Sequence, residues 1–259
     1  MKRINLALYG LAATTAIAGL LVGSATLPSS WAKPSALAKQ PPFAADIASF
    51  EAADKKSPPP RGAVLFIGSS SIRYWTTVAQ DFPEIPVINR GFGGSQIEDS
   101  VRYADRIVIP YKPKLIVFYA GGNDINAGKI PQQVLKDFRA FSNKVHKALP
   151  RTSIAFISIN PSRARWNQEA KILKTNSLIE KYINDTNSKK RRLTYLDSHA
   201  RLLGADGQPQ DNLLRSDGLH LNTEGYKFWV SILRPQILTL ASEAGVKRHN
   251  IQTGETLPQ

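Results

Sequence analysis

The chain has 259 residues, of which 42% are hydrophobic and 21% are charged, and this composition is typical of a folded globular protein. It contains no cysteine, which excludes disulfide bonds, thiolate zinc sites and cysteine nucleophiles. The formal net charge of +14 favours anionic partners.

The first 38 residues have the features of an export signal. Lys2 and Arg3 precede an uncharged run that extends to about residue 27, and small residues suited to cleavage follow it. An uncleaved membrane anchor is the alternative, because the run approaches the roughly 20 residues that cross a bilayer. In both cases we expect the folded part to be periplasmic or secreted, so the expected anionic partner is an envelope surface and not nucleic acid.

Residues 39–60 are rich in Pro and Ala and end in three consecutive prolines. This composition predicts a linker that contains one short helix at about residues 43–53. We expect the folded domain to cover residues 61–243 and a polar tail to cover residues 244–259.

Short apolar segments alternate with helical patterns throughout the expected domain. The clearest are continuous apolar runs of the kind that forms buried strands. Strands that alternate with helices form a parallel sheet with helices on both faces. We therefore predict an α/β fold, a three-layer sandwich around a parallel sheet of about five strands. The expected strands are residues 63–68, 86–89, 114–120, 153–159 and 193–197.

Helices are expected between the strands, where apolar residues recur every three or four positions. Ser95 and Glu98 form a capping-box pattern at the start of the first long helix. In a later helix, at about residues 168–184, Leu173 falls on the face that is predicted to be buried. Pro235 lies within the last helical pattern, and we expect it to kink or restart that helix because it supplies no backbone N–H.

Polar residues collect directly after the expected strands. In an open parallel sheet, ligands bind beyond the carboxyl ends of the strands. The segments that follow the strands are residues 68–71, 89–95 and 121–124 and, after a longer connection, residues 216–220. Together they supply hydroxyl groups, backbone N–H groups at glycines, an amide donor and a carboxylate–imidazole pair, which are the groups that acyl transfer needs.

Each of these segments has an ordinary explanation when it is taken alone. Serines after a strand usually form a turn or a helix cap, and an Asp-x-x-His pair is often a surface hydrogen bond. The glycines at 91, 93 and 94 lack the G-x-G-x-x-G spacing of a dinucleotide loop, and no His, Asp and Glu cluster has metal-ligand spacing. We therefore expect no cofactor and no metal ion, and only the combination of the segments indicates catalysis.

In order and spacing, the four segments resemble those of the SGNH superfamily of GDSL-type esterases and lipases, across nearly all of residues 63–235. The first segment stands where that family has Gly-Asp-Ser, with Ser69 in place of the aspartate. The register from Gly68 selects Ser70 over its neighbours Ser69 and Ser71. The resemblance implies a flavodoxin-like SGNH fold and a carboxylic-ester hydrolase.

The resemblance also implies a role for each site residue. Ser70 is the expected nucleophile, and His220 is the base that removes its proton, oriented by Asp217. The expected oxyanion donors are the N–H groups of Ser70 and Gly94 and the side-chain amide of Asn123. Loss of one such donor typically costs about 100- to 1,000-fold in rate.

His199 is the alternative to His220 as the base. It follows the fifth expected strand, and Asp197 lies two residues before it. It lacks the motif context that surrounds His220.

Residues 160–166 follow the fourth expected strand, and we expect them to rim the same cleft. Arg163 or Arg165 would contact an anionic substrate group, and Trp166 would stack on a sugar or an acyl chain. The alternative is a structural loop in which Trp166 caps the helix behind it.

The chain has no long insertion that could form a hydrophobic lid, so an interfacial triglyceride lipase is not expected. We expect a small-molecule or glycan ester with a short acyl group. Two alternatives are an acyltransferase that uses the same residues and a non-catalytic module that binds the cell envelope.

Overall fold

The computed structural model describes residues 41–187 and 192–249. The predicted signal or anchor, residues 1–38, and the end of the predicted tail, residues 250–259, lie outside the described residues. The described residues all belong to one compact unit. In the described part of the chain, no helix is long and apolar enough to cross a membrane.

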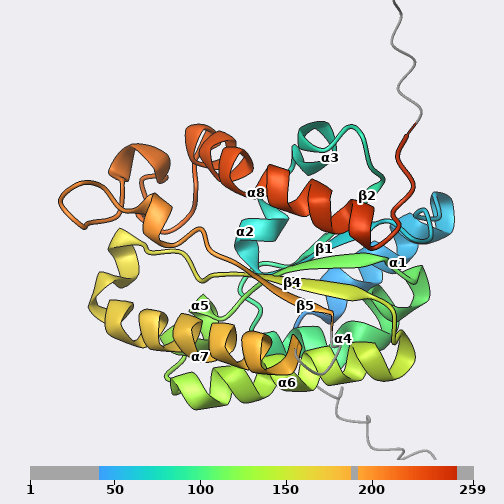
Figure 1. The fold of residues 1–259 in the computed structure, drawn as a ribbon, viewed down its shortest axis with the longest axis horizontal. Helices are drawn as coiled ribbons and strands as arrows, with labels where there is room; N and C mark the ends of the chain where they lie inside the picture. The colour runs from blue at the N-terminus through green and yellow to red at the C-terminus, as the bar shows by residue number, and fades with distance from the viewer. Residues whose placement is uncertain (1–40, 188–191, 250–259) are drawn as a thin grey trace, which may run out of the picture. The chain divides into compact units, whose positions relative to one another are not determined.

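Five parallel strands of the described residues form a sheet in the order β2-β1-β3-β4-β5 (Figure 1). The central strands β1 and β3 are buried at every position, because helices cover both faces of the sheet. The predicted α/β fold, with three layers and five strands, is confirmed. The strands are β1 (Val64–Gly68), β2 (Val87–Gly91), β3 (Leu115–Tyr119), β4 (Ser153–Ile157) and β5 (Leu193–Leu196).

Helices α4 (Ile97–Ile107), α6 (Pro131–Ala148) and α7 (Glu169–Asn187) cover one face of the sheet. Helices α2, α3 and α8 cover the other face, and Figure 1 shows the long α8 opposite α6 and α7. Each side has its own hydrophobic core, rich in aromatic rings. The remaining helices are α1 (Ala44–Lys56), α2 (Ser70–Arg73), α3 (Val78–Asp81), α5 (Gly122–Asn126), α8 (Thr223–Glu243), η1 (Ile109–Tyr111), η2 (Arg163–Gln168), η3 (Ala200–Leu202) and η4 (Asp211–Leu213).

Helix α1 lies in the segment that the sequence predicted to be a linker. Its Ile47 is fully buried, and the Phe43 ring packs edge-on against Phe92 with 5.4 Å between ring centroids. Helix α1 therefore packs into the same compact unit as the residues that follow it. Few apolar residues make these contacts, so the hydrophobic pattern of this segment is weak.

Helix α4 begins one residue later than its sequence pattern predicted. The N–H of Gln96 donates to Asp99 Oδ2 at 2.9 Å, so these two residues, and not Ser95 and Glu98, make the capping interaction. Ser95 is fully buried instead, and its carbonyl accepts a hydrogen bond from Asn123.

One further prediction for the helices was wrong, and another was wrong in part, because α8 does not restart at Pro235. Leu173 is 49% exposed, whereas its neighbour Ile172 is buried against the sheet. Helix α8 continues through Pro235 as one helix. Leu233 and Ile237, on either side of the proline, are both fully buried, and this packing holds the helix together where one backbone hydrogen bond is missing.

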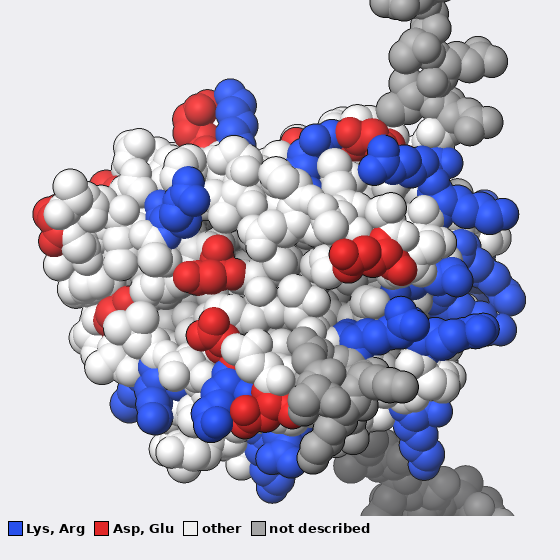
Figure 2. Space-filling view, viewed as in Figure 1, with Lys and Arg blue, Asp and Glu red and all other residues white. Residues whose placement is uncertain are grey.

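Exposed cations gather at the amino ends of the strands, the edge of the sheet opposite the polar segments. We call six of them the basic edge, and none of the six forms an ion pair with another described residue. Figure 2 shows Lys and Arg crowded along the right-hand rim, where β4 begins in Figure 1. The basic edge comprises Arg61, Lys112, Lys114, Lys147, Arg151 and Arg192.

Candidate active site

Ser70, His220 and Asp217 form a continuous chain of hydrogen bonds. Ser70 Oγ lies 2.8 Å from His220 Nε2, and His220 Nδ1 lies 2.7 Å from Asp217 Oδ2. The three residues that the sequence selected as nucleophile, base and orienting carboxylate are thus brought together. Among the described residues, neither Ser69 nor Ser71 makes a hydrogen bond to this imidazole.

The position of Ser70 depends on a close approach of two strands. Gly68 ends β1 with φ +148°, and a Cβ atom there would lie 1.8 Å from the carbonyl oxygen of Tyr119 on β3. Ser70 then begins α2, and the side chain of Asn89 donates to the Ile72 carbonyl at 2.8 Å. The position of Ser70 is therefore fixed by the contact between β1 and β3 and by the hydrogen bond from the Asn89 side chain to the short helix α2.

The loop that carries His220 is fixed by its own hydrogen bonds. Asp217 Oδ1 accepts the N–H groups of Leu219 at 2.9 Å and His220 at 3.0 Å, while Oδ2 faces the imidazole. Burial would raise the pKa of Asp217, but these hydrogen bonds from His220 and Leu219 outweigh it and lower the pKa to about 2. The carboxylate is therefore ionised and oriented at neutral pH.

The Tyr74 ring meets the His220 ring edge-on, with 5.0 Å between centroids, and the Arg215 guanidinium lies 4.6 Å from the centroid of Tyr74. These contacts restrict the rotation of the imidazole about its side-chain bonds.

Asn123 is positioned to offer one amide hydrogen to a ligand. Its Nδ2 donates to the Ser95 carbonyl at 3.0 Å, and its Oδ1 accepts from Arg165 at 3.0 Å. Because an amide nitrogen carries two hydrogens, the second is left for a substrate oxygen. Asn123 and Ser70 line the same small pocket, whose volume is about 30 Å³.

Gly94 has φ +83°, a conformation that favours glycine, and its N–H makes no hydrogen bond to another described residue. A Cβ atom on the preceding Gly93 would lie 3.9 Å from Ser70 Cβ, so this loop lies against the serine. Gly94 itself is not among the residues that line the small pocket.

The three residues predicted to contact substrate face different surroundings. Arg165 lines the small pocket beside Ser70, and burial lowers the pKa of its guanidinium. Arg163 forms an ion pair with Asp211 at 2.5 Å, and it lines a separate cavity together with Trp166. Sequence reasoning missed the contact between Arg165 and Asn123, because 42 residues separate the two.

His199 lies apart from the site. Its ring is buried, with Nε2 2.8 Å from Glu169 Oε1, and its backbone N–H donates to Asp197 Oδ1 at 3.0 Å. Within the described residues it makes no hydrogen bond with Ser70, so the geometry favours His220. No group of three or more His, Cys, Asp or Glu side chains in that part of the chain could hold a metal ion.

A network of charged side chains around the buried Asp124 lies next to Asn123 in the chain. The neighbouring Asp124 is fully buried and accepts the N–H of Ile97 at 3.2 Å. Lys129 Nζ lies 3.1 Å from Asp124 Oδ1 and 2.8 Å from Asp137 Oδ2. Burial raises the pKa of Asp124, although Lys129 acts in the opposite direction. This network fixes the loop after β3 to the start of α4.

The family described as GDSL-like lipase/acylhydrolase matches residues 67–228. No curated protein sequence matches the chain significantly.

Solved structures similar to this chain include a GDSL-like lipase from Bacteroides thetaiotaomicron, with 19% identity and a TM-score of 0.61. The match covers 75% of this chain and 98% of that one. A carbohydrate esterase family 3 protein from Talaromyces cellulolyticus has 21% identity and a TM-score of 0.57, and the match covers 70% of this chain and 98% of that one. A family 3 carbohydrate esterase from Clostridium thermocellum has 15% identity and a TM-score of 0.56, with the same coverage of both chains. At these identities the likeness establishes the fold.

Replacing Lys129 by Met should destabilise the fold strongly, because it leaves the buried Asp124 without its cation. Removing one partner of a buried ion pair costs about 3–5 kcal/mol, and we expect urea denaturation to show a loss of that size in the free energy of unfolding. The matched control is Lys227→Met, because Lys227 and Glu224 form an exposed pair, with side chains 69% and 64% exposed. The control should lose no more than about 1 kcal/mol. Equally small losses in both variants would contradict the supporting role of Lys129.

Proposed function

We propose that this chain, which belongs to the GDSL-like lipase/acylhydrolase family and is a carboxylic-ester hydrolase, cleaves short acyl esters through an acyl-enzyme on Ser70. The observation that carries the proposal is the hydrogen-bond chain from Ser70 through His220 to Asp217. A serine hydroxyl is a weak nucleophile until a base removes its proton, and this geometry supplies the base within reach.

In the first half of the reaction, Ser70 Oγ attacks the ester carbonyl and its proton passes to His220 Nε2. Asp217 stays ionised and stabilises the imidazolium. The N–H groups of Ser70 and Gly94 and the amide of Asn123 stabilise the developing oxyanion. His220 then donates its proton to the leaving alkoxide, and the alcohol departs from the acyl-enzyme.

In the second half, water loses a proton to His220 Nε2 as its oxygen attacks the acyl carbon. The tetrahedral intermediate collapses, Ser70 Oγ takes the proton back from the imidazolium, and the carboxylic acid leaves. If a second alcohol replaced water in this step, the same residues would carry out acyl transfer.

The size of the small pocket supports a short acyl group. Its volume of about 30 Å³ is bounded by Tyr119, Ile159 and Ile172. This restricted space beside Ser70 favours a short acyl group over a long acyl chain. The two carbohydrate esterases among the similar structures support a sugar as the alcohol part of the ester.

Arg165 acts in this proposal as a positioning residue. Its guanidinium holds Asn123 Oδ1 at 3.0 Å, which turns the Asn123 amide nitrogen toward Ser95 and the reacting oxygen. No described carboxylate forms an ion pair with Arg165, so its charge also favours the oxyanion.

The basic edge supports a second part of the proposal, that the exported protein binds an anionic envelope surface with the active site facing away from it. Residues that precede parallel strands meet at one edge of the sheet, and the catalytic segments lie at the other. Clustered Lys and Arg side chains attract anionic lipids, each by about 1 kcal/mol near the surface.

Ser70→Ala should lower kcat/KM for p-nitrophenyl acetate at least about 1,000-fold, because no other hydroxyl group of the described residues forms a hydrogen bond with the base. Ser69→Ala, in the same loop, is the matched control and should retain most of the activity. Unchanged turnover in Ser70→Ala would overturn the assignment of the nucleophile. No turnover in the wild type would favour a binding module, and formation of a new ester with added alcohol would favour a transferase.

Because the pKa of Asp217 is lowered from 3.8 to about 2, its ionised form stabilises the fold above pH 3.8 and this contribution is lost only as the pH falls towards 2. The acid limb of kcat/KM above about pH 4 should therefore follow the uptake of one proton, with a slope of one. Acetate release measured across this range provides the profile. A slope of two would show that Asp217 also titrates there.

Arg165→Met should lower kcat by about tenfold with little change in KM, less than the 100- to 1,000-fold loss expected for Asn123→Ala. Arg165→Lys keeps the charge but loses the fork of donors, so it should restore part of kcat. A rise in KM with unchanged kcat would instead place Arg165 in ground-state binding of the substrate.

The triple variant Lys112→Glu, Lys114→Glu and Arg151→Glu should lose binding to anionic lipid vesicles, in a chain that begins at residue 40, while its esterase activity is unchanged. Cosedimentation at increasing salt provides the measurement. Lys181→Glu with Lys227→Glu, two exposed lysines that do not belong to the basic edge, is the control. Equal loss in both variants would contradict a localised binding face.

A further inference from the structure

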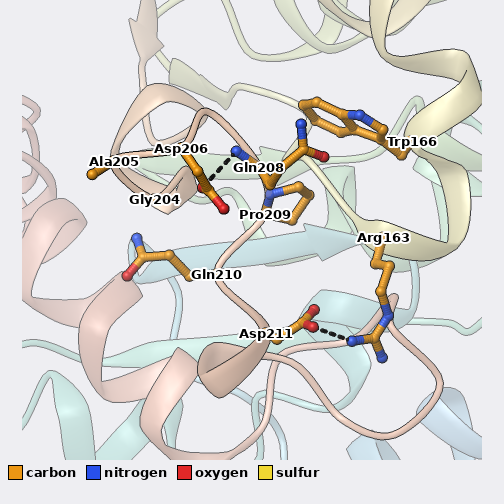
Figure 3. Close-up of a pocket in the computed structure, with 9 residues that line it drawn as sticks. All are labelled: Arg163, Trp166, Gly204, Ala205, Asp206, Gln208, Pro209, Gln210 and Asp211. Atoms are coloured by element: carbon orange, nitrogen blue, oxygen red, sulfur yellow. Dashed lines mark hydrogen bonds and ion pairs between the residues drawn. The ribbon is translucent and has the colours of Figure 1, made fainter.

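A second and larger cavity lies beside the catalytic loop. Its volume is about 830 Å³, within the range of about 300–1,000 Å³ typical of ligand pockets. It lies between η2 and the loop of residues 204–211, and Figure 3 shows Trp166 and Arg163 on one side and this loop on the other. Its lining residues are Arg163, Trp166, Gly204, Ala205, Asp206, Gln208, Pro209, Gln210 and Asp211.

The helix η2 connects this cavity with the catalytic site. The N–H of Ala164 donates to the carbonyl of Gly218 at 3.0 Å, and Gly218 is part of the loop between Asp217 and His220. Arg163 and Trp166 line the large cavity, whereas Arg165, on the same turn, lines the small pocket at Ser70. A substrate whose acyl group lies at Ser70 can therefore extend across η2 into the large cavity.

The lining of the cavity suits a sugar. The partly buried Trp166 offers a broad apolar ring, on which the C–H face of a pyranose can stack. Gln208 carries an exposed amide that can donate and accept hydrogen bonds, as the hydroxyl groups around a sugar ring require. The amide nitrogen of Gln210 already donates to the carbonyls of Arg201 at 3.1 Å and Leu203 at 3.2 Å, which leaves its oxygen as an acceptor. A long alkyl chain would make no hydrogen bond with these amides, so the lining favours a sugar.

The charges of the lining favour a neutral sugar over an acidic one. Arg163, the only cation among the lining residues, is already paired with Asp211 at 2.5 Å. Asp206 adds a further carboxylate, whose Oδ1 accepts the N–H of Gln208 at 3.0 Å. The lining thus carries two carboxylates and one cation, so its net negative charge would repel the carboxylate of a uronate. The predicted contact of Arg163 with an anionic substrate group does not fit this arrangement.

We propose that the large cavity is a subsite for a neutral saccharide, which forms the alcohol part of the ester cleaved at Ser70. This proposal rests on the proposed esterase function. Binding to the Ser70→Ala protein can be measured without turnover, so the subsite and the esterase function are tested separately.

Tryptophan fluorescence of Ser70→Ala provides the direct test. Trp75 and Trp229 are fully buried, so among the described tryptophans only Trp166 can meet a ligand. Titration with O-acetylated cellotriose or mannotriose should change the emission saturably, and adding Trp166→Phe should abolish the change. O-acetylated trigalacturonate should bind at least about tenfold more weakly, because its carboxylates face Asp206 and Asp211. No saturable change with the neutral trisaccharides, or tighter binding of the uronate, would overturn the subsite.

Kinetics of Trp166→Ala in the active protein give the second readout. KM for the acetylated trisaccharide should rise about tenfold, which corresponds to 1.4 kcal/mol, whereas kcat/KM for p-nitrophenyl acetate, which carries no saccharide, should fall by a much smaller factor. Leu173→Ala, which removes an exposed apolar side chain on α7 outside the cavity, is the matched control. Equal losses on both esters would overturn the subsite and leave the esterase in place. Saccharide binding without turnover of either ester by the wild type would overturn the proposed function, and with it the role of the cavity as an ester subsite.

Discussion

The hydrogen bond between Ser70 Oγ and His220 Nε2 joins two loops that lie 150 residues apart, and the rest of the site is arranged around it. The sheet fixes the position of Ser70, because Gly68 allows β1 to approach β3 closely and Ser70 follows at the start of α2. Tyr226 on α8 donates to the Ser71 carbonyl at 2.7 Å, so the long helix also holds α2 in place. The position of His220 is set by Asp217, whose carboxylate accepts hydrogen bonds from the backbone of the same loop and from the imidazole. The site therefore depends on the parallel topology, which brings these loops together, as well as on the side chains.

Much of this arrangement could be predicted from the sequence. Buried parallel strands appear as continuous apolar runs, and the residues that follow them must meet at one edge of the sheet, which placed Ser70, Asn123 and His220 together. Contacts between distant side chains leave no such local signal. The hydrogen bond from Arg165 to Asn123 could not be predicted from the sequence, because an arginine in a loop can either bind substrate or hold another side chain. The start of α4 was misplaced by one residue, since both Ser95 and Gln96 precede an acidic residue at the capping distance.

In our proposal the two pockets divide the recognition of substrate, a division that the sequence did not indicate. The small pocket of about 30 Å³ limits the acyl group, and the cavity of about 830 Å³ across η2 offers space for a larger alcohol. Loops at the carboxyl ends of the strands build both, whereas the basic edge lies at the amino ends. Under the proposed function, this arrangement leaves the cavity accessible to a saccharide ester while the basic edge binds an anionic surface.

The central claim, that Ser70 is the nucleophile, is tested most directly by covalent trapping. A fluorophosphonate reacts with a serine only when a neighbouring base activates it. Our account predicts a single adduct in the intact mass, mapped by fragmentation to Ser70, with loss of labelling in His220→Ala. An adduct on Ser69 or Ser71, or inhibition without any adduct on residues 69–71, would contradict it.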